Sequence, residues 1–513
     1  MQRRDFIGLL GLSTLAGVSG CGRKSSPSHS VASGPDVDLV LTAVPDEVRL
    51  LPGEMTRIWR FKGNLLKGPA STLQTLPNSY LGPVIGLRRG QKVRIRFVNQ
   101  LPEDSVVHWH GLDVPANADG HPRLAISQSK EYVVEFEVIN RAGTYWYHPH
   151  PHARTGAQVY QGLAGLLLVG DKEEDALGLP SGEAELICTL QDRQFDERNQ
   201  FVYAGGAGMM GMMAMMGGFL GDRVLVNGNL PTTTQVNAAW HRVRLLNGSN
   251  ARIYKLAWSH DAPMTLIGSD GGLLEHPVNQ KTLTLAPGQR ADVLLDLTSL
   301  ASGTEVHLES QAFPAADAGG GGMMGMMGMR GSMMGGGSSA PNGMPLRLTT
   351  LRVAGRKGPA LHLPERLSVF DDSWSLRNEA PIRRVSLAFQ QMSWLIGGRT
   401  FEMEGVAPDE SVTAGSTHLW EFVNMANPMG MQTAHPIHIH GRQFRVVSRS
   451  GGVPANALRA GIADAGWMDT VLVLLGETVR VQTTFTRYPG LYLYHCHILE
   501  HEDMGMMRNF KVT

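Results

Sequence analysis

Short runs in which apolar and polar residues alternate recur along most of the chain. Clear examples are KVRIRFVNQ, EYVVEFEVI, HRVRLLNGS, RQFRVVSR and TVRVQTTF, which begin at positions 92, 131, 241, 442 and 478. An alternation with a period of two is typical of a strand with one buried face, and Gly, Pro and Asn residues separate the runs. Convincing long helices are few. The pattern predicts an all-β protein built from β-sandwiches.

A weak internal repeat divides these runs into three groups. GPVIGLRRGQKVRIRFVNQLPED near the start is similar to APDESVTAGSTHLWEFVNMANPM near the end, and each leads into a histidine-rich run. LPTTTQVNAAWHRVRLLNGSNARIYKL repeats the strand pattern between them without the histidines. We therefore expect three related domains after a leader of residues 1–35, at 36–175, 176–355 and 356–513, of which the middle one lacks metal.

The first residues have the features of an export signal. MQRRDFIGLLGLSTLAGVSGC places Arg3 and Arg4 before a short apolar run, which resembles a twin-arginine signal. The sequence VSGC resembles a lipoprotein box, which would make Cys21 a lipidated N-terminus. The alternative is simple cleavage nearby and release of a soluble protein. We expect a periplasmic protein that contacts the membrane only through a lipid anchor at Cys21, if that anchor exists.

Composition narrows the range of partners. The 513 residues include 46 basic and 46 acidic side chains, so the formal net charge is zero. This balance argues against nucleic acid or an anionic membrane surface as the main partner. The three cysteines are too few for a disulfide framework. We expect a monomer that acts on small molecules.

Four histidine motifs carry the candidate chemistry. They contain ten of the nineteen histidines: His108, His110, His148, His150, His435, His438, His440, His495, His497 and His501. Residues i and i+2 of a strand share a face, so each H-x-H pair directs two imidazoles to one point. Four pairs give eight imidazoles, which is too many for one ion and suits a cluster. Imidazole binds copper, zinc, iron and nickel, so these motifs alone do not identify the metal.

The residues around Cys496 do identify it. In a strand, His495 and His497 point to one side and Cys496 to the other, so Cys496 binds a different ion. Its partners would be the remaining His435, His501 downstream and Met506 as a weak axial ligand. Two histidines, one thiolate and a weak methionine are the ligands of blue-copper sites. Cys496 would connect that copper to the cluster through one peptide unit on each side.

These four ordered motifs resemble those of the multicopper oxidases, a family that includes laccases, ferroxidases and bacterial cuprous oxidases. The resemblance covers nearly the whole chain after the leader, and no ligand position is missing. It implies three cupredoxin-like Greek-key β-sandwich domains and four copper ions, with a trinuclear cluster between the first and last domains. It also implies O2 as the acceptor of four electrons, which the substrate donates one at a time.

The resemblance assigns the ligands residue by residue. Type 1 copper takes His435, Cys496, His501 and Met506; type 2 takes His108 and His438; the type 3 pair takes His110, His148, His150, His440, His495 and His497. Asp119 and Glu502 stand where related oxidases use acids to supply protons, and Cys496 relays electrons. Asp119 has an alternative interpretation as a turn residue before Gly120.

Within the family, GWMDTV, HCHILEHEDMGMM, TGAQVYQGLAG and the signal are most similar to bacterial periplasmic cuprous oxidases of copper tolerance. Two Met-rich stretches, at 208–218 and 319–337, hold 13 of the 26 methionines. Soft thioethers favour Cu(I), so these stretches could gather the substrate. The relatives carry such an insert in the last domain, whereas both stretches here fall in the middle one. The alternative is a Gly/Met spacer without a ligand role.

Several residues near the expected type 1 site are further candidates for binding substrate Cu(I): Met425, Met429, Met431, Met468 and Asp469. Each methionine has an alternative interpretation as a core residue. Two other functions remain open. One is a general laccase, which would oxidise small aromatic reductants such as phenols. The other is a copper-sequestering lipoprotein that uses its Met-rich stretches as a buffer.

Overall fold

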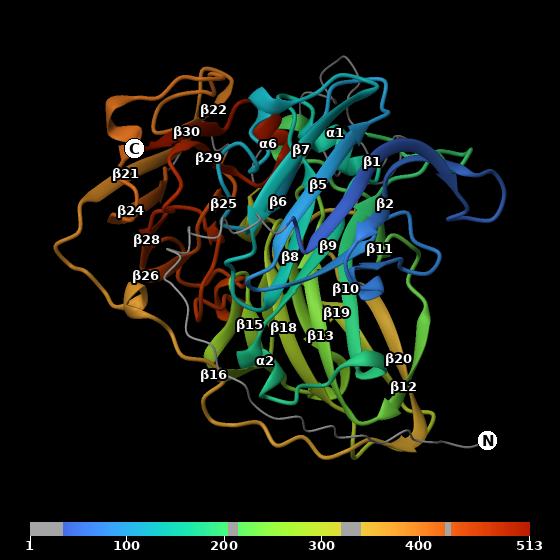
Figure 1. Ribbon diagram of the computed structural model, residues 1–513. Helices are drawn as coiled ribbons and strands as arrows, with labels where there is room; N and C mark the ends of the chain where they lie inside the picture. The colour runs from blue at the N-terminus through green and yellow to red at the C-terminus, as the bar shows by residue number, and fades with distance from the viewer. Residues whose placement is uncertain (1–33, 204–213, 320–339, 426–431) are drawn as a thin grey trace, which may run out of the picture. The chain divides into compact units, whose positions relative to one another are not determined.

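The computed structural model describes residues 34–203, 214–319, 340–425 and 432–513. Strands dominate these residues and form six sheets (Figure 1). The all-β prediction is therefore confirmed. The predicted export signal and Cys21 lie outside the described residues.

The first pair of sheets contains β1 to β9. One sheet has the order β2-β1-β5-β7, with bounds Thr56–Lys67, Val37–Val48, Lys92–Asn99 and Lys130–Glu137. The other has the order β3-β4-β9-β8-β6, with bounds Leu73–Gln74, Val84–Arg88, Gly165–Gly170, Gly143–Pro149 and Val107–His110. Buried residues of both sheets, such as Leu39, Ile95 and Leu167, share one hydrophobic core. The alternating residues of the sequence thus form the inner faces of a sandwich.

The middle pair contains β10 to β20. The larger sheet has the order β11-β10-β13-β18-β15-β16, with bounds Arg223–Val226, Glu185–Arg193, Trp240–Asn247, Arg290–Asp296, Met264–Ser269 and Gly272–Gln280. Its partner has the order β12-β20-β19-β14-β17, with bounds Thr233–Ala238, Leu346–Lys357, Glu305–Ser310, Tyr254–Trp258 and Leu283–Leu285. The predicted boundary near 176 falls between strands, whereas the one near 355 falls inside β20. The pairing of β20 with β12 extends past residue 355 as far as Lys357.

The last pair contains β21 to β30. One sheet has the order β22-β21-β24-β28-β26, with bounds Ser393–Ile396, Ile382–Gln390, Thr417–Asn424, Glu477–Thr484 and Phe444–Gly451. The other has the order β23-β30-β29-β25-β27, with bounds Ser411–Val412, Met507–Val512, Gly490–Cys496, His435–Ile439 and Thr470–Val473. Phe422, Val481, Ile437 and Phe510 from the two sheets share a core that also contains Cys496.

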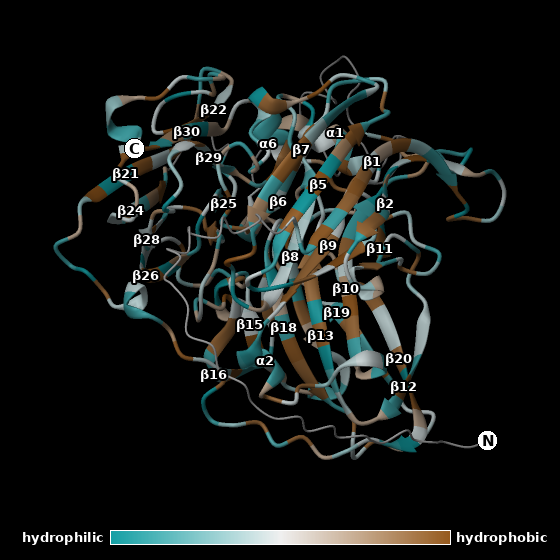
Figure 2. Ribbon diagram, viewed as in Figure 1, coloured by the Kyte–Doolittle hydropathy of each residue, from teal (hydrophilic) through white to brown (hydrophobic). Residues whose placement is uncertain are grey.

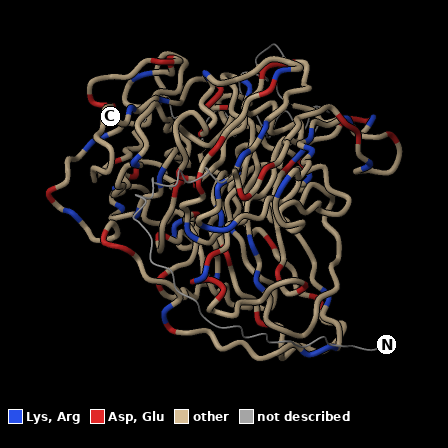
Figure 3. The backbone as a smooth tube through the Cα atoms, in the orientation of Figure 1, with Lys and Arg blue, Asp and Glu red and all other residues tan. Residues whose placement is uncertain are grey.

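The three pairs of sheets repeat one pairing rule. Each contains two parallel strand pairs, namely β1 with β5 and β4 with β9, β10 with β13 and β12 with β20, and β21 with β24 and β23 with β30. The weak sequence repeat thus has a structural counterpart. Figure 2 shows hydrophobic residues, in brown, along strands such as β1, β9 and β13. Basic and acidic residues are interspersed along the described backbone (Figure 3).

Short helices lie in the connections. Their bounds are Thr155–Tyr160 for α1, Lys172–Asp175 for α2, Ala315–Ala318 for α4 and Leu499–Asp503 for α6. Helix α6 follows directly after β29 and packs against α1. No helix among the described residues has the length and apolar character needed to cross a bilayer.

Candidate metal centres

Eight histidines from the first and last pairs of sheets meet in one buried group, which we call the histidine cluster. Strand pairing sets their positions, because His108 on β6 faces His148 on β8, and His438 on β25 faces His495 on β29. The cluster consists of His108, His110, His148, His150, His438, His440, His495 and His497, none more than 1 % exposed. The four H-x-H motifs of the sequence are thus brought together.

Pairs of ring nitrogens face one another across the cluster. The separations are 3.1 Å for His440 Nε2 to His495 Nε2, 3.3 Å for His150 Nε2 to His495 Nε2, 3.3 Å for His108 Nε2 to His438 Nε2, and 3.4 Å for His110 Nδ1 to His148 Nε2. Two imidazole nitrogens bound to one ion at about 2.0–2.1 Å would lie roughly 3.3 Å apart in tetrahedral geometry. Neither nitrogen of His497 has a hydrogen-bond partner among the described residues. The cluster therefore fits metal ions.

Burial favours the neutral form of several of these imidazoles. It lowers the pKa of His148 to about 3 and that of His150 to about 4, and neighbouring histidines add to the effect. The same causes hold the pKa of His108, His440 and His497 well below the ordinary value. A neutral imidazole keeps one lone pair for a metal.

In three of the rings, those of His108, His438 and His440, an oxygen atom fixes the other nitrogen. His108 Nδ1 lies 2.6 Å from the Asp119 carbonyl, His438 Nδ1 lies 2.8 Å from the Asp469 carbonyl, and His440 Nδ1 lies 2.8 Å from Asp119 Oδ2. Carbonyl oxygens only accept, so the hydrogens of His108 and His438 lie on Nδ1 and their Nε2 atoms face the cluster.

Two buried acids flank the cluster, and their pKa values shift in opposite directions. Glu502 on α6 lies 3.1 Å from His495 Nδ1 and 3.5 Å from His150 Nε2. Burial alone would raise the pKa of Glu502, but His150 and His495 hold it below its usual range. Burial and the nearby Asp113 raise the pKa of Asp119 well above its usual range. The surroundings thus favour a proton on Asp119 and a charge on Glu502.

A second group forms around Cys496, and we call it the cysteine centre. Cys496 Sγ lies 3.4 Å from His435 Nδ1 and 3.6 Å from His501 Nδ1. Met506 is fully buried in the same core, and its carbonyl accepts a hydrogen bond from Cys496 N at 3.1 Å. Burial raises the pKa of the Cys496 thiol. These donors are the set of a blue-copper site.

The cysteine centre has an apolar lining. The Trp394 ring stacks on His501, with ring centres 4.4 Å apart, and contacts His435 edge to face at 5.0 Å. His501 Nε2 donates to the Met216 carbonyl at 3.0 Å, which leaves Nδ1 directed at the sulfur. Cys496 is bonded on either side to His495 and His497 of the histidine cluster. One short backbone segment therefore connects both centres.

Family models for multicopper oxidases match three segments of the chain, residues 60–174, 192–304 and 378–513. Together these segments cover most of the sequence and include every histidine of both centres. The chain belongs to the multicopper oxidase family. The family implies copper as cofactor and O2 as electron acceptor, and the donors described above fit copper ions.

Individual relatives of this multicopper oxidase agree over most of its length. It is 31 % identical to the multicopper oxidase mco of Staphylococcus aureus, over 88 % of this chain and 86 % of that one. It is 30 % identical to a laccase of Bacillus stratosphericus, over 86 % and 90 % of the two chains. The solved structure of a Campylobacter jejuni multicopper oxidase, described as a metallo-oxidase, superposes with a TM-score of 0.72 at 26 % identity and covers 93 % of this chain and 91 % of that one.

The described members of the predicted substrate-copper set of this multicopper oxidase lie in different places. Asp469 is buried beside the histidine cluster, where its Oδ1 lies 3.0 Å from His110 Nε2. Met468 is buried in the core of the last pair of sheets. Met425 is 46 % exposed, and Met429 and Met431 lie outside the described residues. Sequence reasoning also missed Arg290, which binds Asp469 and belongs to no histidine motif.

Proposed function

We propose that this multicopper oxidase oxidises Cu(I) to Cu(II) in copper tolerance. Four Cu(I) ions each give up one electron, and one O2 takes up these four electrons and four protons to form two waters. His435, Cys496, His501 and Met506 would hold type 1 copper, and the histidine cluster would hold the type 2 ion and the type 3 pair. Copper bound at these sites supplies one-electron redox chemistry and O2 reduction.

The choice of Cu(I) rests on one observation: the described residues at the edges of the Met-rich stretches lie beside the cysteine centre. In the first stretch, Met216 gives its carbonyl to His501 Nε2. Tyr203 and Phe219, on either side of this stretch, both bind the Glu500 carboxylate, through Tyr203 OH at 2.8 Å and Phe219 N at 3.0 Å. Glu500 directly precedes His501, so the first stretch is fastened beside one histidine of the cysteine centre.

The second stretch is fastened beside the other histidine. Gly319 forms a β-bridge with Thr433, and Ala434 N donates to the Ala318 carbonyl at 2.9 Å. Thr433 and Ala434 directly precede His435. Although both stretches belong to the middle part of the sequence, their described ends thus lie at the cysteine centre. Thioethers prefer Cu(I), which supports delivery of Cu(I) to this centre.

The chain itself provides an electron path and a proton supply. The peptide units on either side of Cys496 lead to His495 and His497, so electrons that enter at the cysteine centre have a covalent route to the cluster. The Glu502 carboxylate touches His495 and can hold a proton and pass it to the cluster. Asp119 holds His440 Nδ1 on the other side. The hydrogen bonds of His435, Cys496 and His501 among the described residues include no acidic side chain.

O2 consumption separates the proposal from the laccase alternative. Purified copper-loaded enzyme is supplied with Cu(I), with a phenol, or with the phenol plus Cu(II). The proposal expects fast consumption with Cu(I) and slow consumption with the phenol unless Cu(II) is added. Brisk oxidation of the phenol without added copper would favour a general laccase instead.

Deletion of the Met-rich stretches separates catalysis from sequestration. Removing 209–213 and 323–334 leaves the contacts of Met216 and Gly319 in place. The proposal expects slower Cu(I) oxidation and unchanged oxidation of an organic donor. A collapse of copper tolerance in cells while Cu(I) oxidation persists would favour a sequestering lipoprotein. Copper content with visible and spin-resonance spectra tests the assignment of the four ions.

A further inference from the structure

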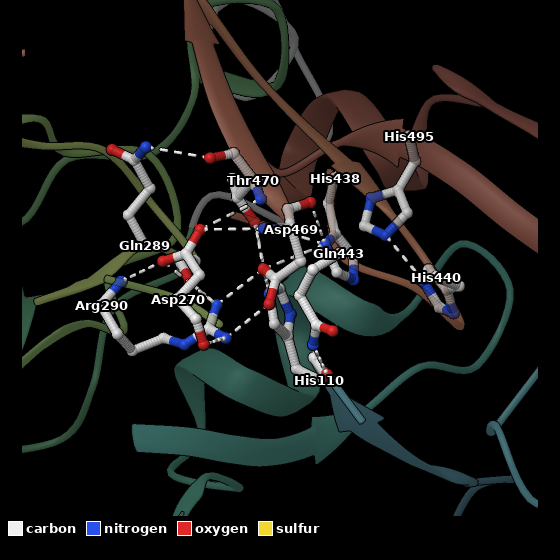
Figure 4. A network of polar contacts seen from close by, with 12 residues as sticks. His110, Asp270, Gln289, Arg290, His438, His440, Gln443, Asp469, Thr470 and His495 are labelled. Carbon is white, nitrogen blue, oxygen red and sulfur yellow. Dashed lines mark hydrogen bonds and ion pairs between the residues drawn. The ribbon is translucent and has the colours of Figure 1, made fainter. Parts of the chain in front are cut away.

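A buried ion pair connects the middle strands with the histidine cluster (Figure 4). Arg290, the first residue of β18, places Nη1 2.7 Å from Asp469 Oδ1 and Nη2 2.5 Å from Asp469 Oδ2. Its other N–H groups donate to the carbonyls of Thr144 at 3.0 Å, Gly288 at 2.9 Å and Asp270 at 3.0 Å. All five guanidinium N–H groups are therefore used, which fixes the orientation of the side chain.

Backbone N–H groups and a glycine next to the ion pair leave room for it and hold it in place. Asp270 Oδ1 accepts from Arg290 N at 2.7 Å, while its Oδ2 accepts from the N–H groups of Asp469 at 3.2 Å and Thr470 at 3.1 Å. Gly111, directly after His110, has φ +91°, and a Cβ there would lie 2.6 Å from both Arg290 Nη2 and Asp469 Oδ2. Glycine thus lets the ion pair reach the backbone of a cluster histidine.

Hydrogen bonds to Asp469 determine which ring nitrogen carries the hydrogen in two histidines, one from the first and one from the last pair of sheets. Its ionised carboxylate can only accept, so His110 carries its hydrogen on Nε2, 3.0 Å from Asp469 Oδ1. His110 Nδ1 is then free to face His148 across 3.4 Å. The Asp469 carbonyl fixes the opposite tautomer in His438, whose Nδ1 lies 2.8 Å away. With Asp469 held in this position, His110 presents Nδ1 and His438 presents Nε2 to the cluster.

We propose that Arg290 is a positioning residue: it holds Asp469, and Asp469 sets the tautomers of His110 and His438. Through Arg290 the middle pair of sheets, whose described strands contribute none of the proposed ligands, acts on the cluster. The inference rests on the proposed role of the histidine cluster as a copper site. It assigns to Asp469 a function at the cluster rather than in binding substrate Cu(I). It concerns metal affinity and is independent of which reductant the enzyme uses.

A merely structural ion pair would look similar, so the test needs a matched control. Arg242 on β13 is also buried, and its Nη2 lies 2.5 Å from Asp292 Oδ2 on β18. Among the described residues its ion pairs are with Asp292, Glu174 and Glu185, and none involves a histidine. Arg242→Lys therefore removes a comparable guanidinium from the same sheet without touching the cluster. Arg290→Lys and Asp469→Asn each weaken the ion pair, one from the side of the base and one from the side of the acid. Both substitutions keep nearly the native side-chain volume.

The experiment measures copper retention and not turnover. Each full-length protein is loaded with copper and titrated with a copper chelator. The thiolate-to-copper absorption reports on the cysteine centre, and total copper reports on both centres. Loss of an outer hydrogen-bond partner typically lowers metal affinity about 10- to 100-fold. We expect Arg290→Lys and Asp469→Asn to lose cluster copper at 10- to 100-fold lower chelator concentration while the thiolate absorption follows wild type.

Thermal unfolding of the copper-free proteins completes the comparison. Arg242→Lys should lower the unfolding temperature without moving the chelator titration. If Arg290→Lys and Asp469→Asn behave like Arg242→Lys in both measurements, Arg290 is only structural and the inference is wrong. If Arg290→Lys does not fold, Asp469→Asn alone decides. Wild type that loads no cluster copper would instead contradict the proposed function itself.

Discussion

The histidine cluster and the cysteine centre are both fully buried, but their surroundings differ. Acidic side chains surround the cluster, where Asp119, Glu502 and Asp469 touch its imidazoles. Aromatic and aliphatic side chains surround the cysteine centre, among them Trp394 and Ile498. O2 reduction needs protons together with electrons, whereas accepting an electron from substrate does not. The contrast supports the proposed division of roles, in which the cluster handles protons together with electrons and the cysteine centre passes electrons alone.

The strongest test of this division removes the group that joins the two centres. Cys496→Ser takes away the thiolate, so the cysteine centre loses its copper absorption band and O2 consumption falls to background with Cu(I) and with a phenol. The cluster keeps its copper because none of its eight histidines changes. Visible spectra, copper content and oxygen uptake check this. Persistent turnover in this variant would mean that electrons reach the cluster by another route.

The next test removes a charge from the cluster only. Glu502→Gln keeps the shape of the side chain but ends proton transfer, so we expect kcat to fall about 10²- to 10⁴-fold with every reductant. Anaerobic bleaching of the thiolate band by reductant should keep its wild-type rate. Asp503→Asn is the control, because Asp503 binds Thr155 N and Gly156 N instead of the cluster. Slower bleaching in Glu502→Gln would show that the two centres are not separable in this way.

A third test weakens the contact between the first Met-rich stretch and the cysteine centre. Glu500 accepts hydrogen bonds from Tyr203 OH and Asn250 Nδ2, both at 2.8 Å, and from Phe219 N. In Glu500→Gln one of these donors meets an amide NH2, which costs on the order of 1–3 kcal/mol locally. We expect the KM for Cu(I) to rise roughly 10-fold, which corresponds to about 1.4 kcal/mol.

Steady-state kinetics with two donors check the Glu500→Gln prediction. The KM and kcat for an organic donor should stay close to wild type, because Glu500 does not touch Cys496 or the cluster. An equal rise in KM for both donors would contradict a specific role of the stretch in delivering Cu(I). Glu500 and Glu502 lie on the same short helix, so the two variants compare an effect on Cu(I) delivery with an effect on O2 reduction.

Strand alternation predicted much of both centres from the sequence. A period of two places His495 and His497 on one side of Cys496, and in the structure Cys496 lies with His435 and His501 instead. The alternation also predicted sandwiches, because each inner face repeats the same apolar pattern. These features depend on residues close in sequence, for which spacing determines direction.

The Arg290–Asp469 pair could not be predicted in the same way. The two residues lie 179 positions apart, and neither belongs to a histidine motif. Asp469 was instead expected at a substrate Cu(I) site, because its neighbour Met468 offers a thioether and its own carboxylate would neutralise the charge of the ion. The positions of the Met-rich ends were likewise hidden, since Ala318 and Thr433 meet only when the middle and last strands are packed. Tertiary packing decides such contacts, and no local period encodes them.

The mildest test changes the cysteine centre while keeping it apolar. Met506→Leu preserves volume in a packed core, so the free energy of unfolding should fall by less than about 1.5 kcal/mol. A thioether is a weak axial ligand that tunes the reduction potential, and it stabilises the oxidised ion more than the reduced one. We therefore expect a higher potential and a shifted thiolate band, with copper content unchanged and turnover altered less than in the other variants. Redox titration and spectra check this. Loss of the band, as in Cys496→Ser, would show that the cysteine centre depends on a polar donor after all, and the contrast with the histidine cluster would then be one of degree.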